Sequence, residues 1–324
     1  MYRIGIVGFG SMGHQHFAAL LKYDRAQVIG VFDPCPERVG LAESLGLLAY
    51  PSAEALFADP KIDIAIIAST NNLHKDHSIN ALGAGKHIIC EKPATITSTE
   101  LLEVIDVAQK NGKFFTINQN RRWDKDFLLM KEHIESGLLG RVYTIESRVH
   151  NSFGIPKGWR NAKDMGGGMM LDWGVHLIDQ ILHMTDKVVT NVFCRMNHLH
   201  YPDVEDDFKL FLTFCCGLTA QIEVGTNNFA ALPRWYVLGK QGTLQVDDWD
   251  CRGKIVIQTQ TIQIPGTANA RSHKYLNAVY SQLLDAIEGA AELKITPHQA
   301  LRVMRTIEAA FLSSNTKSAL EVSI

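Results

Sequence analysis

The sequence lacks the features that would place it in a membrane, on nucleic acid or in an oxidised compartment. Its 324 residues contain no uninterrupted apolar run near the ~18 residues that a membrane-spanning helix needs. The net charge of -2 gives no general attraction to nucleic acid or to an anionic membrane. The six cysteines show no C-x-x-C pair and no zinc-ribbon spacing. We therefore expect reduced thiols, no metal site and a cytoplasmic protein. Residues from 2 onward already have strand character, so we expect no secretory signal.

The composition is that of a soluble globular protein, with 46% hydrophobic and 20% charged residues. The length suits two domains of ordinary size. Up to about residue 118, short apolar runs alternate with helical stretches, which predicts a doubly wound parallel sheet. The predicted strands are 2–7, 27–32, 62–68, 86–90 and 113–117, and the predicted helices include 36–45, 74–83 and 98–110.

A glycine-rich turn follows the first predicted strand. Residues Gly8-Phe9-Gly10-Ser11-Met12-Gly13 open a helical stretch, and Asp33 follows Gly13 by twenty residues. Such glycines allow a tight turn and a close approach of the backbone to a pyrophosphate, whose charge the N–H groups of the helix start receive. The sequence therefore predicts a dinucleotide site, with a bare glycine turn as the alternative. Because the Asp33 carboxylate would repel a 2′-phosphate, we expect NAD, with NADP as the alternative if Arg38 turns inward.

After residue 119 the pattern changes, and we expect a second domain over 120–324 beside the first over 1–119. Helices are predicted at 124–136, 169–184, 274–288 and 297–314, with a β-run from 140 and mostly alternating β material over 188–264. This pattern favours an α+β domain with an open, mostly antiparallel sheet. No internal repeats or low-complexity segments occur.

Two short segments carry side chains that could take part in catalysis. Glu91-Lys92-Pro93 ends the fourth predicted strand, and Asp172 precedes His176 by four residues at the start of a predicted helix. Residues four apart share a helix face, so the carboxylate can fix the imidazole tautomer and raise its basicity. An exposed ion pair is the alternative for that spacing.

Together these residues resemble the Gfo/Idh/MocA oxidoreductase family, named for glucose–fructose oxidoreductase and inositol dehydrogenase. The resemblance covers nearly the whole chain. It also rests on Asn71-Asn72-Leu73-His74, on 84–93, on Gly166-Gly167-Gly168 and on 238–244.

The resemblance implies an N-terminal Rossmann domain and an enzyme that transfers a hydride between nicotinamide and a sugar, polyol or inositol-type substrate. It implies that Lys92 hydrogen-bonds the reacting oxygen, that His176 is the general acid/base with Asp172 as its partner, and that the Lys92–Pro93 peptide is cis. All three side chains are expected at one reacting site at the domain junction. The predicted substrate contacts are Asn120, Arg122, Trp159, Arg160, Asp172 and His176, for which a solvated basic patch beside a core tryptophan is the alternative. The predicted cofactor contacts are Gly8, Phe9, Gly10, Ser11, Met12, Gly13, Asp33, Ser69, Thr70, Asn71, His74, Glu91 and Lys92.

Two alternatives remain open within the family: an NAD-dependent glycosidase and a non-catalytic nucleotide or sugar sensor. The β-runs 208–214 and 219–224 are apolar on both faces of the alternation, with Phe211 opposite Phe208, Leu210, Leu212 and Phe214. Because such a face is an aggregation risk in water, we expect a homodimer or homotetramer through the second domain's sheet. His14 and His16 are expected to pack against the cofactor or another domain, and His77 to lie on the surface.

Overall fold

The structure is a computed structural model that describes residues 1–267 and 275–324. Contacts group the chain into two units. Unit 1 comprises Met1–Gln119 and His273–Leu301, and unit 2 comprises Asn120–Ser272 and Arg302–Ile324. The predicted division differs in one respect, because it assigned everything after residue 119 to the second domain.

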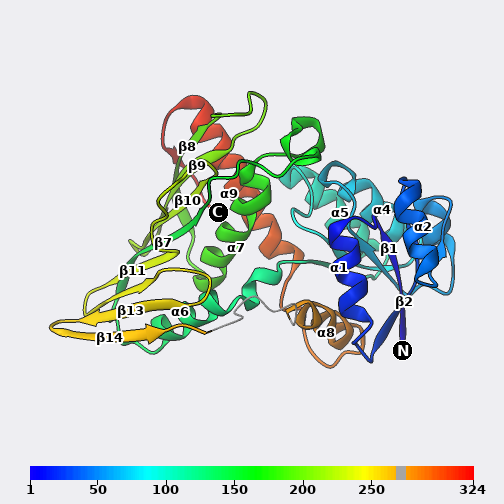
Figure 1. Cartoon of the computed structure of the whole chain (residues 1–324), viewed down its shortest axis with the longest axis horizontal. Coiled ribbons are helices and arrows are strands. Elements are labelled where there is room, and N and C mark those ends of the chain that lie inside the picture. Colours follow the sequence, from blue (N-terminus) through cyan, green and yellow to red (C-terminus); the bar gives the residue numbers. More distant parts are fainter. Residues whose placement is uncertain (268–274) are drawn as a thin grey trace. The chain divides into compact units, whose positions relative to one another are not determined.

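In the described part of unit 1, six strands form a parallel sheet in the order β3-β2-β1-β4-β5-β6, of which β1 and β2 are labelled in Figure 1. The strands are β1 (Tyr2–Val7), β2 (Ala26–Phe32), β3 (Leu48–Ala49), β4 (Ile64–Ile67), β5 (His87–Cys90) and β6 (Phe115–Ile117). This is the strand order of a doubly wound dinucleotide-binding fold, and it confirms the predicted class. All four residues of β4 are buried, as a parallel strand covered by helices on both faces requires.

Helices flank this sheet. They are α1 (Ser11–Leu20), α2 (Pro36–Ser44), α3 (Ala53–Ala58), the 3₁₀ turn η1 (Asn71–Leu73), α4 (His74–Gly83) and α5 (Ser98–Lys110). Helix α5 begins with a capping box, in which Thr97 Oγ1 accepts from the Glu100 N–H and the Glu100 carboxylate accepts from the Thr97 N–H, both at 3.2 Å. Each helix that the pattern predicted in this half is present.

Helix α8 (Tyr275–Ile287) belongs to unit 1, and here the contact grouping differs from the predicted domain division. It packs against α1, and the Ser281 and Tyr23 hydroxyls lie 2.9 Å apart. The Arg25 guanidinium donates to the Asp285 carboxylate at 2.7 Å. These pairings are more than 250 residues apart in sequence, so no local pattern indicates them. Residue 274, the first of the predicted helix, lies outside the described residues.

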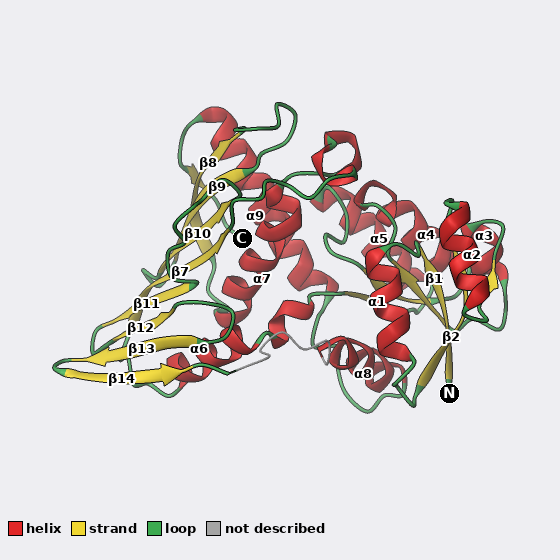
Figure 2. Ribbon diagram, viewed as in Figure 1, coloured by secondary structure: helices red, strands yellow, loops and turns green. Residues whose placement is uncertain are grey.

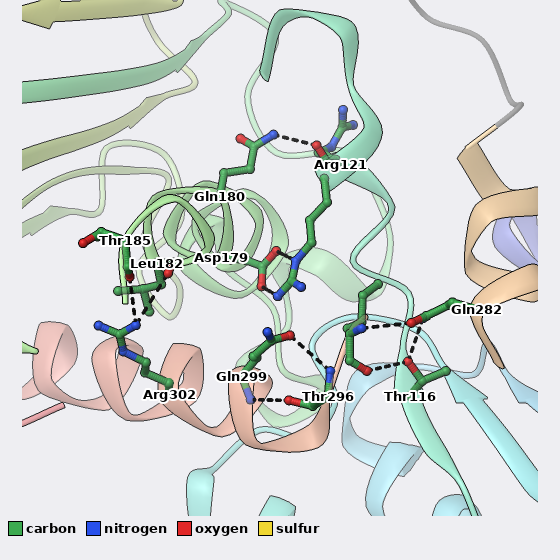
Figure 3. A network of polar contacts seen from close by, with 12 residues as sticks. Thr116, Arg121, Asp179, Gln180, Leu182, Thr185, Gln282, Thr296, Gln299 and Arg302 are labelled. Carbon is green, nitrogen blue, oxygen red and sulfur yellow. Dashed lines mark hydrogen bonds and ion pairs between the residues drawn. The ribbon is translucent and has the colours of Figure 1, made fainter. Parts of the chain in front are cut away.

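Gln282 ties the segment after α8 to the sheet of unit 1 (Figure 3). Its side-chain oxygen accepts from the N–H groups of Lys294 at 2.8 Å and Ile295 at 2.9 Å, and its amide donates to Thr116 Oγ1 at 3.0 Å. The Thr116 hydroxyl donates to the Ile295 carbonyl at 2.9 Å. Because this buried amide has all these partners, it holds in place the segment that leads to α9 (Pro297–Thr316). The boundary between the two units in the sequence falls inside α9.

Among the described residues of unit 2, nine strands form one sheet in the order β14-β13-β12-β11-β7-β10-β9-β8-β15. β7 and β10 run parallel, and every other neighbouring pair runs antiparallel. The strands are β7 (Val142–His150), β8 (Val189–Asn197), β9 (Asp207–Phe214), β10 (Thr219–Gly225), β11 (Trp235–Gly239), β12 (Thr243–Val246), β13 (Arg252–Ile257), β14 (Gln260–Pro265) and β15 (Leu320–Glu321). The mostly antiparallel sheet confirms the predicted fold class.

Helices α6 (Lys125–Glu135) and α7 (Val175–Met184) lie along one side of this sheet (Figure 2). In β9 the side chains of Phe208, Leu210, Leu212 and Phe214 are buried, as the alternation predicts for a covered face. No helix in the described residues is long and apolar enough to cross a membrane.

The other face of the unit-2 sheet differs from the apolar surface that the sequence predicts. Phe211 is 42% exposed and stacks obliquely on Phe193 at 6.3 Å, but Lys209, Arg195 and Glu223 follow two positions along on the same face. Glu223 lies 3.2 Å from Lys209 Nζ and 3.4 Å from His150 Nε2. Burial raises the pKa of Glu223, but its hydrogen bonds with His150 and Lys209 outweigh that effect and lower the pKa to about 2. The face is therefore mixed in character.

Candidate active site

The glycine turn of unit 1 brings the start of α1 against the end of β1. A Cβ added to Gly13 would lie 2.0 Å from the Gly8 carbonyl oxygen, so only glycine allows this approach. Gly10 is the N-cap residue of α1 and has no side chain to cap it. The first-turn N–H groups of an α-helix have no acceptor within the helix, and at this site they suit a phosphate. The geometry fits the predicted cofactor contacts from Gly8 to Gly13.

Asp33 follows β2 and its side chain is only 1% exposed. Its two carboxylate oxygens accept hydrogen bonds from the N–H groups of Phe9 at 2.7 Å and Cys35 at 2.9 Å. Arg38 Nη1 donates to the same carboxylate at 3.3 Å. The carboxylate is thus fixed to the glycine turn, and its contact with a ribose hydroxyl stays a prediction. The half-exposed Arg38 beside it reduces the repulsion of a 2′-phosphate.

The residues that follow β4 lie at the same carboxyl-terminal edge of the sheet as the glycine turn. The Ser69 hydroxyl pairs with His77 Nδ1 at 3.1 Å, and Thr70 Oγ1 donates to the Asn72 side-chain oxygen at 2.7 Å. Asn71 is buried. Because His77 is partly buried and bound to Ser69, the prediction that it is only a surface residue is wrong.

Glu91 and Lys92 follow β5, and the Lys92–Pro93 peptide is cis as predicted. Glu91 is buried, and its Oε1 accepts from Asn118 at 2.6 Å and from His16 at 2.9 Å. Burial raises the pKa of Glu91, but the hydrogen bonds from His16 and Asn118 outweigh it and hold the pKa below its usual value. The buried carboxylate therefore stays ionised.

Asn118 offers a test of whether this edge fits a nicotinamide group. Its Nδ2 donates to Glu91, which leaves its Oδ1 as an acceptor. That oxygen is buried and has no hydrogen-bond partner among the described residues. Since a buried acceptor without a partner is costly, a donor such as the nicotinamide carboxamide suits this position. Residues of unit 1 therefore fit the predicted cofactor.

In unit 2 the glycine-rich segment leads into a helix that begins irregularly. Residues Met170–Gly174 form a π-helical turn, η5, before α7, where the pattern predicts one continuous helix. Gly168 has φ +100°, and a Cβ added to it would lie 2.4 Å from the Glu205 carboxylate. That carboxylate accepts from the Met170 N–H at 2.7 Å. The turn needs glycine because Glu205 occupies the space of a side chain, and π-helical turns are frequent at functional sites.

Asp172 lies in η5, and His176 lies in the first turn of α7, where it is 5% exposed. Arg160 Nε lies 3.4 Å from Asp172 Oδ1, and the Arg160 guanidinium covers the Trp159 ring at 4.6 Å. The Trp173 ring meets His176 edge-on at 6.0 Å. Unit 2 thus brings the predicted residues Trp159, Arg160 and Asp172 together. A direct contact between Asp172 and His176 stays a prediction.

Arg122 occupies a different environment from the one predicted. Its guanidinium donates to both oxygens of Asp179 at 2.8 and 2.6 Å, and the two side chains are 5% and 3% exposed. Such a bidentate pair in the interior favours a structural role over the predicted substrate contact. Asn120 opens the 3₁₀ turn η2 (Asn120–Trp123) and is only partly buried, so it remains a candidate for substrate.

Within α7, Gln180 links two arginines of unit 2. Its amide donates to the Arg121 carbonyl at 2.8 Å (Figure 3), and its oxygen accepts from Arg234 at 3.2 Å. Burial lowers the pKa of Arg234 to about 10, although the carboxylate of Asp126 acts in the opposite direction. Arg121 covers the Trp173 ring at 4.1 Å. This network fixes the helix that carries His176.

Sequence reasoning missed several of these supports. Asp179 and Gln180 follow His176 by three and four residues, so their helical spacing was an available signal. Glu205 gave no such signal, because it lies 35 residues from its partner Met170. His16 was noticed only as a packing residue, whereas it is bound to Glu91.

Comparison with known proteins matches both halves of the chain to one family. Residues 2–119 match the model described as the oxidoreductase family with an NAD-binding Rossmann fold, and residues 127–245 match the GFO/IDH/MocA C-terminal domain. A crystal structure of an NAD-binding protein from Listeria innocua is 42% identical, covers 99% of this chain and 96% of its own, and superposes with a TM-score of 0.93.

Two curated relatives are more distant. The scyllo-inositol 2-dehydrogenase (NADP(+)) IolW of Bacillus subtilis is 27% identical over 97% of this chain and 94% of its own. The 1,5-anhydro-D-fructose reductase of Ensifer adhaerens is 27% identical over 75% of each chain.

Proposed function

This chain belongs to the Gfo/Idh/MocA family of oxidoreductases, and from that premise we propose that it interconverts a secondary alcohol and a ketone on a sugar, polyol or inositol-type substrate. The observation that carries the proposal is the joint presence of Glu91-Lys92-Pro93 after β5 and of Asp172 and His176 at the start of α7. The chain retains all three polar groups that the reaction needs. Relatives named as an inositol dehydrogenase and an anhydrofructose reductase support this substrate class.

Each proposed catalytic residue has a role set by its chemistry. When bound, nicotinamide accepts or returns the hydride at the carbinol carbon. His176 takes the hydroxyl proton during oxidation and returns it during reduction, because an imidazole exchanges protons near neutral pH. Lys92 donates a hydrogen bond to the reacting oxygen and stabilises its developing negative charge. Asp172 holds the imidazole in the productive tautomer.

Substrate contacts are proposed for the partly exposed polar and aromatic residues of unit 2. Trp159 and Arg160 lie next to Asp172, and Asn120 begins η2. An aromatic face with neighbouring polar groups suits a sugar ring, whose C–H groups pack on the ring while its hydroxyls are hydrogen-bonded.

We propose NAD as the preferred cofactor because Asp33 is fixed with a carboxylate oxygen towards the glycine turn. NADP remains an alternative, since Arg38 lies 3.3 Å from that carboxylate. A homodimer or homotetramer through the exposed face of the unit-2 sheet is proposed from the Phe193–Phe211 pair and the charges around Glu223. The six cysteines lie among the described residues and are all free, which suits a cytoplasmic protein.

The test is a panel of sugars, polyols and inositols with NAD or NADP, followed at the absorbance band of the reduced nicotinamide. Net formation of reduced cofactor with at least one member supports the proposal. Release of a glycosyl product from a glycoside without net reduction would identify the glycosidase instead. Cofactor binding without turnover on the whole panel, in either direction, would identify a sensor and refute the proposal.

A further inference from the structure

Two buried histidines of unit 1 form hydrogen bonds with the residues on either side of Lys92. His16 comes from α1 and binds the side chain of Glu91, while His74 begins α4 and binds the backbone of Pro93. Both histidines are 0% exposed. We propose that His16 and His74 are positioning residues that together aim the Lys92 ammonium group. This inference rests on the proposed function of Lys92.

On the Glu91 side, hydrogen bonds form a directed chain. A carboxylate only accepts, so His16 Nε2 carries the proton of the 2.9 Å bond to Glu91 Oε1. On the other side of the ring, His16 Nδ1 lies 2.7 Å from the Tyr280 hydroxyl, and we assign Nδ1 as the acceptor of this bond. The other carboxylate oxygen accepts from the backbone N–H of Lys92 at 3.3 Å. The chain from α8 through α1 therefore ends on the backbone of Lys92 itself.

On the Pro93 side, His74 lies between two carbonyl oxygens. Its Nδ1 is 2.7 Å from the Pro93 oxygen, and its Nε2 is 3.1 Å from the Ser69 oxygen. Burial lowers the pKa of His74, while its hydrogen bonds with the Pro93 and Ser69 carbonyl groups act in the opposite direction. We assign the stronger hydrogen bond to Nδ1, which donates to the Pro93 oxygen, because its contact is the shorter. His74 thus holds the carbonyl that follows Lys92.

Clamping both neighbours fixes the base of the Lys92 side chain, from which four methylene groups reach the ammonium. Misplacement of a reacting group by about 1 Å costs on the order of 10²-fold in rate. Loss of either grip should therefore lower kcat by roughly 10- to 100-fold. Because both rings are 0% exposed, any effect on cofactor affinity should be indirect and small.

The two ring nitrogens allow matched variants at each site. Asparagine places an amide near the Nδ1 position of histidine, and glutamine places one near Nε2. At His74, where Nδ1 acts, His74→Asn should keep kcat within about threefold, while His74→Gln should lose it 10- to 100-fold. At His16, where Nε2 acts on Glu91, the order should reverse, with His16→Gln active and His16→Asn impaired. A merely structural role would make activity follow thermal stability and would not reverse the preference between the sites.

A second readout does not depend on turnover. In a short pulse of acetic anhydride, mass spectrometry gives the labelling rate of the Lys92 amine, with exposed Lys22 as the internal control. The impaired variants should label Lys92 several-fold faster and Lys22 at the wild-type rate. Tyr280→Phe, which removes one hydroxyl, should lower kcat several-fold and serves if a histidine variant does not fold.

The outcomes separate this inference from the proposed function. If wild-type protein turns over the panel and Lys92→Ala abolishes turnover, but all four histidine variants share one kcat and one Lys92 labelling rate, the inference is wrong and the function stands. If no substrate is turned over, yet the Lys92 labelling rates show the opposite asparagine–glutamine preference at the two sites, then His16 and His74 do position Lys92 and the proposed function is wrong. An unchanged kcat in Tyr280→Phe would refute the part of the inference that concerns His16.

Discussion

Removing Asp179 should destabilise unit 2 more than any change at its surface. Both oxygens of Asp179 accept from the Arg122 guanidinium, at 2.8 and 2.6 Å. The two side chains are 5% and 3% exposed, so water cannot replace the lost carboxylate. Asp179→Ala therefore removes the carboxylate that the buried Arg122 guanidinium binds with two nitrogens.

The size of the effect follows from the contacts. Two hydrogen bonds between charged groups contribute about 1.5–3 kcal/mol each, or roughly 3–6 kcal/mol together. Removal of one partner from a buried ion pair costs about 3–5 kcal/mol. We expect the free energy of unfolding of unit 2 to fall by about 3–5 kcal/mol, a large part of the stability of an ordinary domain.

Urea denaturation followed by tryptophan fluorescence measures this quantity selectively. All tryptophans of the chain fall within Asn120–Ser272, namely Trp123, Trp159, Trp173, Trp235 and Trp249. Their emission therefore reports on unit 2, and linear extrapolation gives its unfolding free energy.

Two further variants control the experiment. Glu135→Ala removes the partner of Lys131 in an exposed i,i+4 pair and should cost less than about 0.5 kcal/mol. Replacing both members of the buried pair, Arg122→Met with Asp179→Leu, should recover most of the loss, because no unpaired charge remains. If Asp179→Ala cost no more than Glu135→Ala, the assignment of Arg122 to a structural pair would be wrong.

Three other predictions concern single positions. Gly168→Ala should lower turnover and reduce the free energy of unfolding by about 1–3 kcal/mol, because φ is +100° and the new Cβ would meet the Glu205 carboxylate. Urea titration and kcat measure these two effects, and wild-type values for both would contradict the geometry. Asp33→Ala should shift the ratio of kcat/KM for NAD over NADP towards NADP, and an unchanged ratio would remove Asp33 from cofactor selection. The pKa of Glu223 is lowered from 4.5 to about 2, so its ionisation stabilises unit 2 above pH 4.5 and that stabilisation, on the order of 2–3 kcal/mol, is lost as the pH falls towards 2. Glu223→Gln should flatten this acid limb of the stability profile, and a profile identical to wild type would show that the pairing with His150 contributes nothing.

The features of unit 1 that the sequence predicts are those set by local rules. The glycine turn, the apolar strands and Asp33 occur at fixed spacing, and the structure has each of them in the expected element. Local rules predict helix α8 but not that it belongs to unit 1, because the hydrogen bonds that join it to the α1 region link residues more than 250 positions apart. The same reason hides the link from Tyr280 through His16 to Glu91.

In unit 2 the sequence predicts the helix that carries His176 but not its irregular start. The π-helical turn at Met170–Gly174 depends on Glu205, a distant residue that caps Met170. Arg122 shows a second limit of sequence reasoning. Its charge and its place beside a tryptophan suit a ligand pocket and an internal ion pair equally, and only the contact with Asp179 distinguishes them.

The most direct test of the account is the turnover of His176→Ala with a substrate that the wild-type enzyme uses. We predict that kcat falls by roughly two to four orders of magnitude, the usual contribution of a general base, while the dissociation constant for the cofactor is unchanged. Lys92→Ala should behave alike, and the double variant should lose less than the two losses combined, since both groups act on one transition state. Near-normal kcat in His176→Ala would contradict the central claim and leave Asp172 and His176 as structural residues.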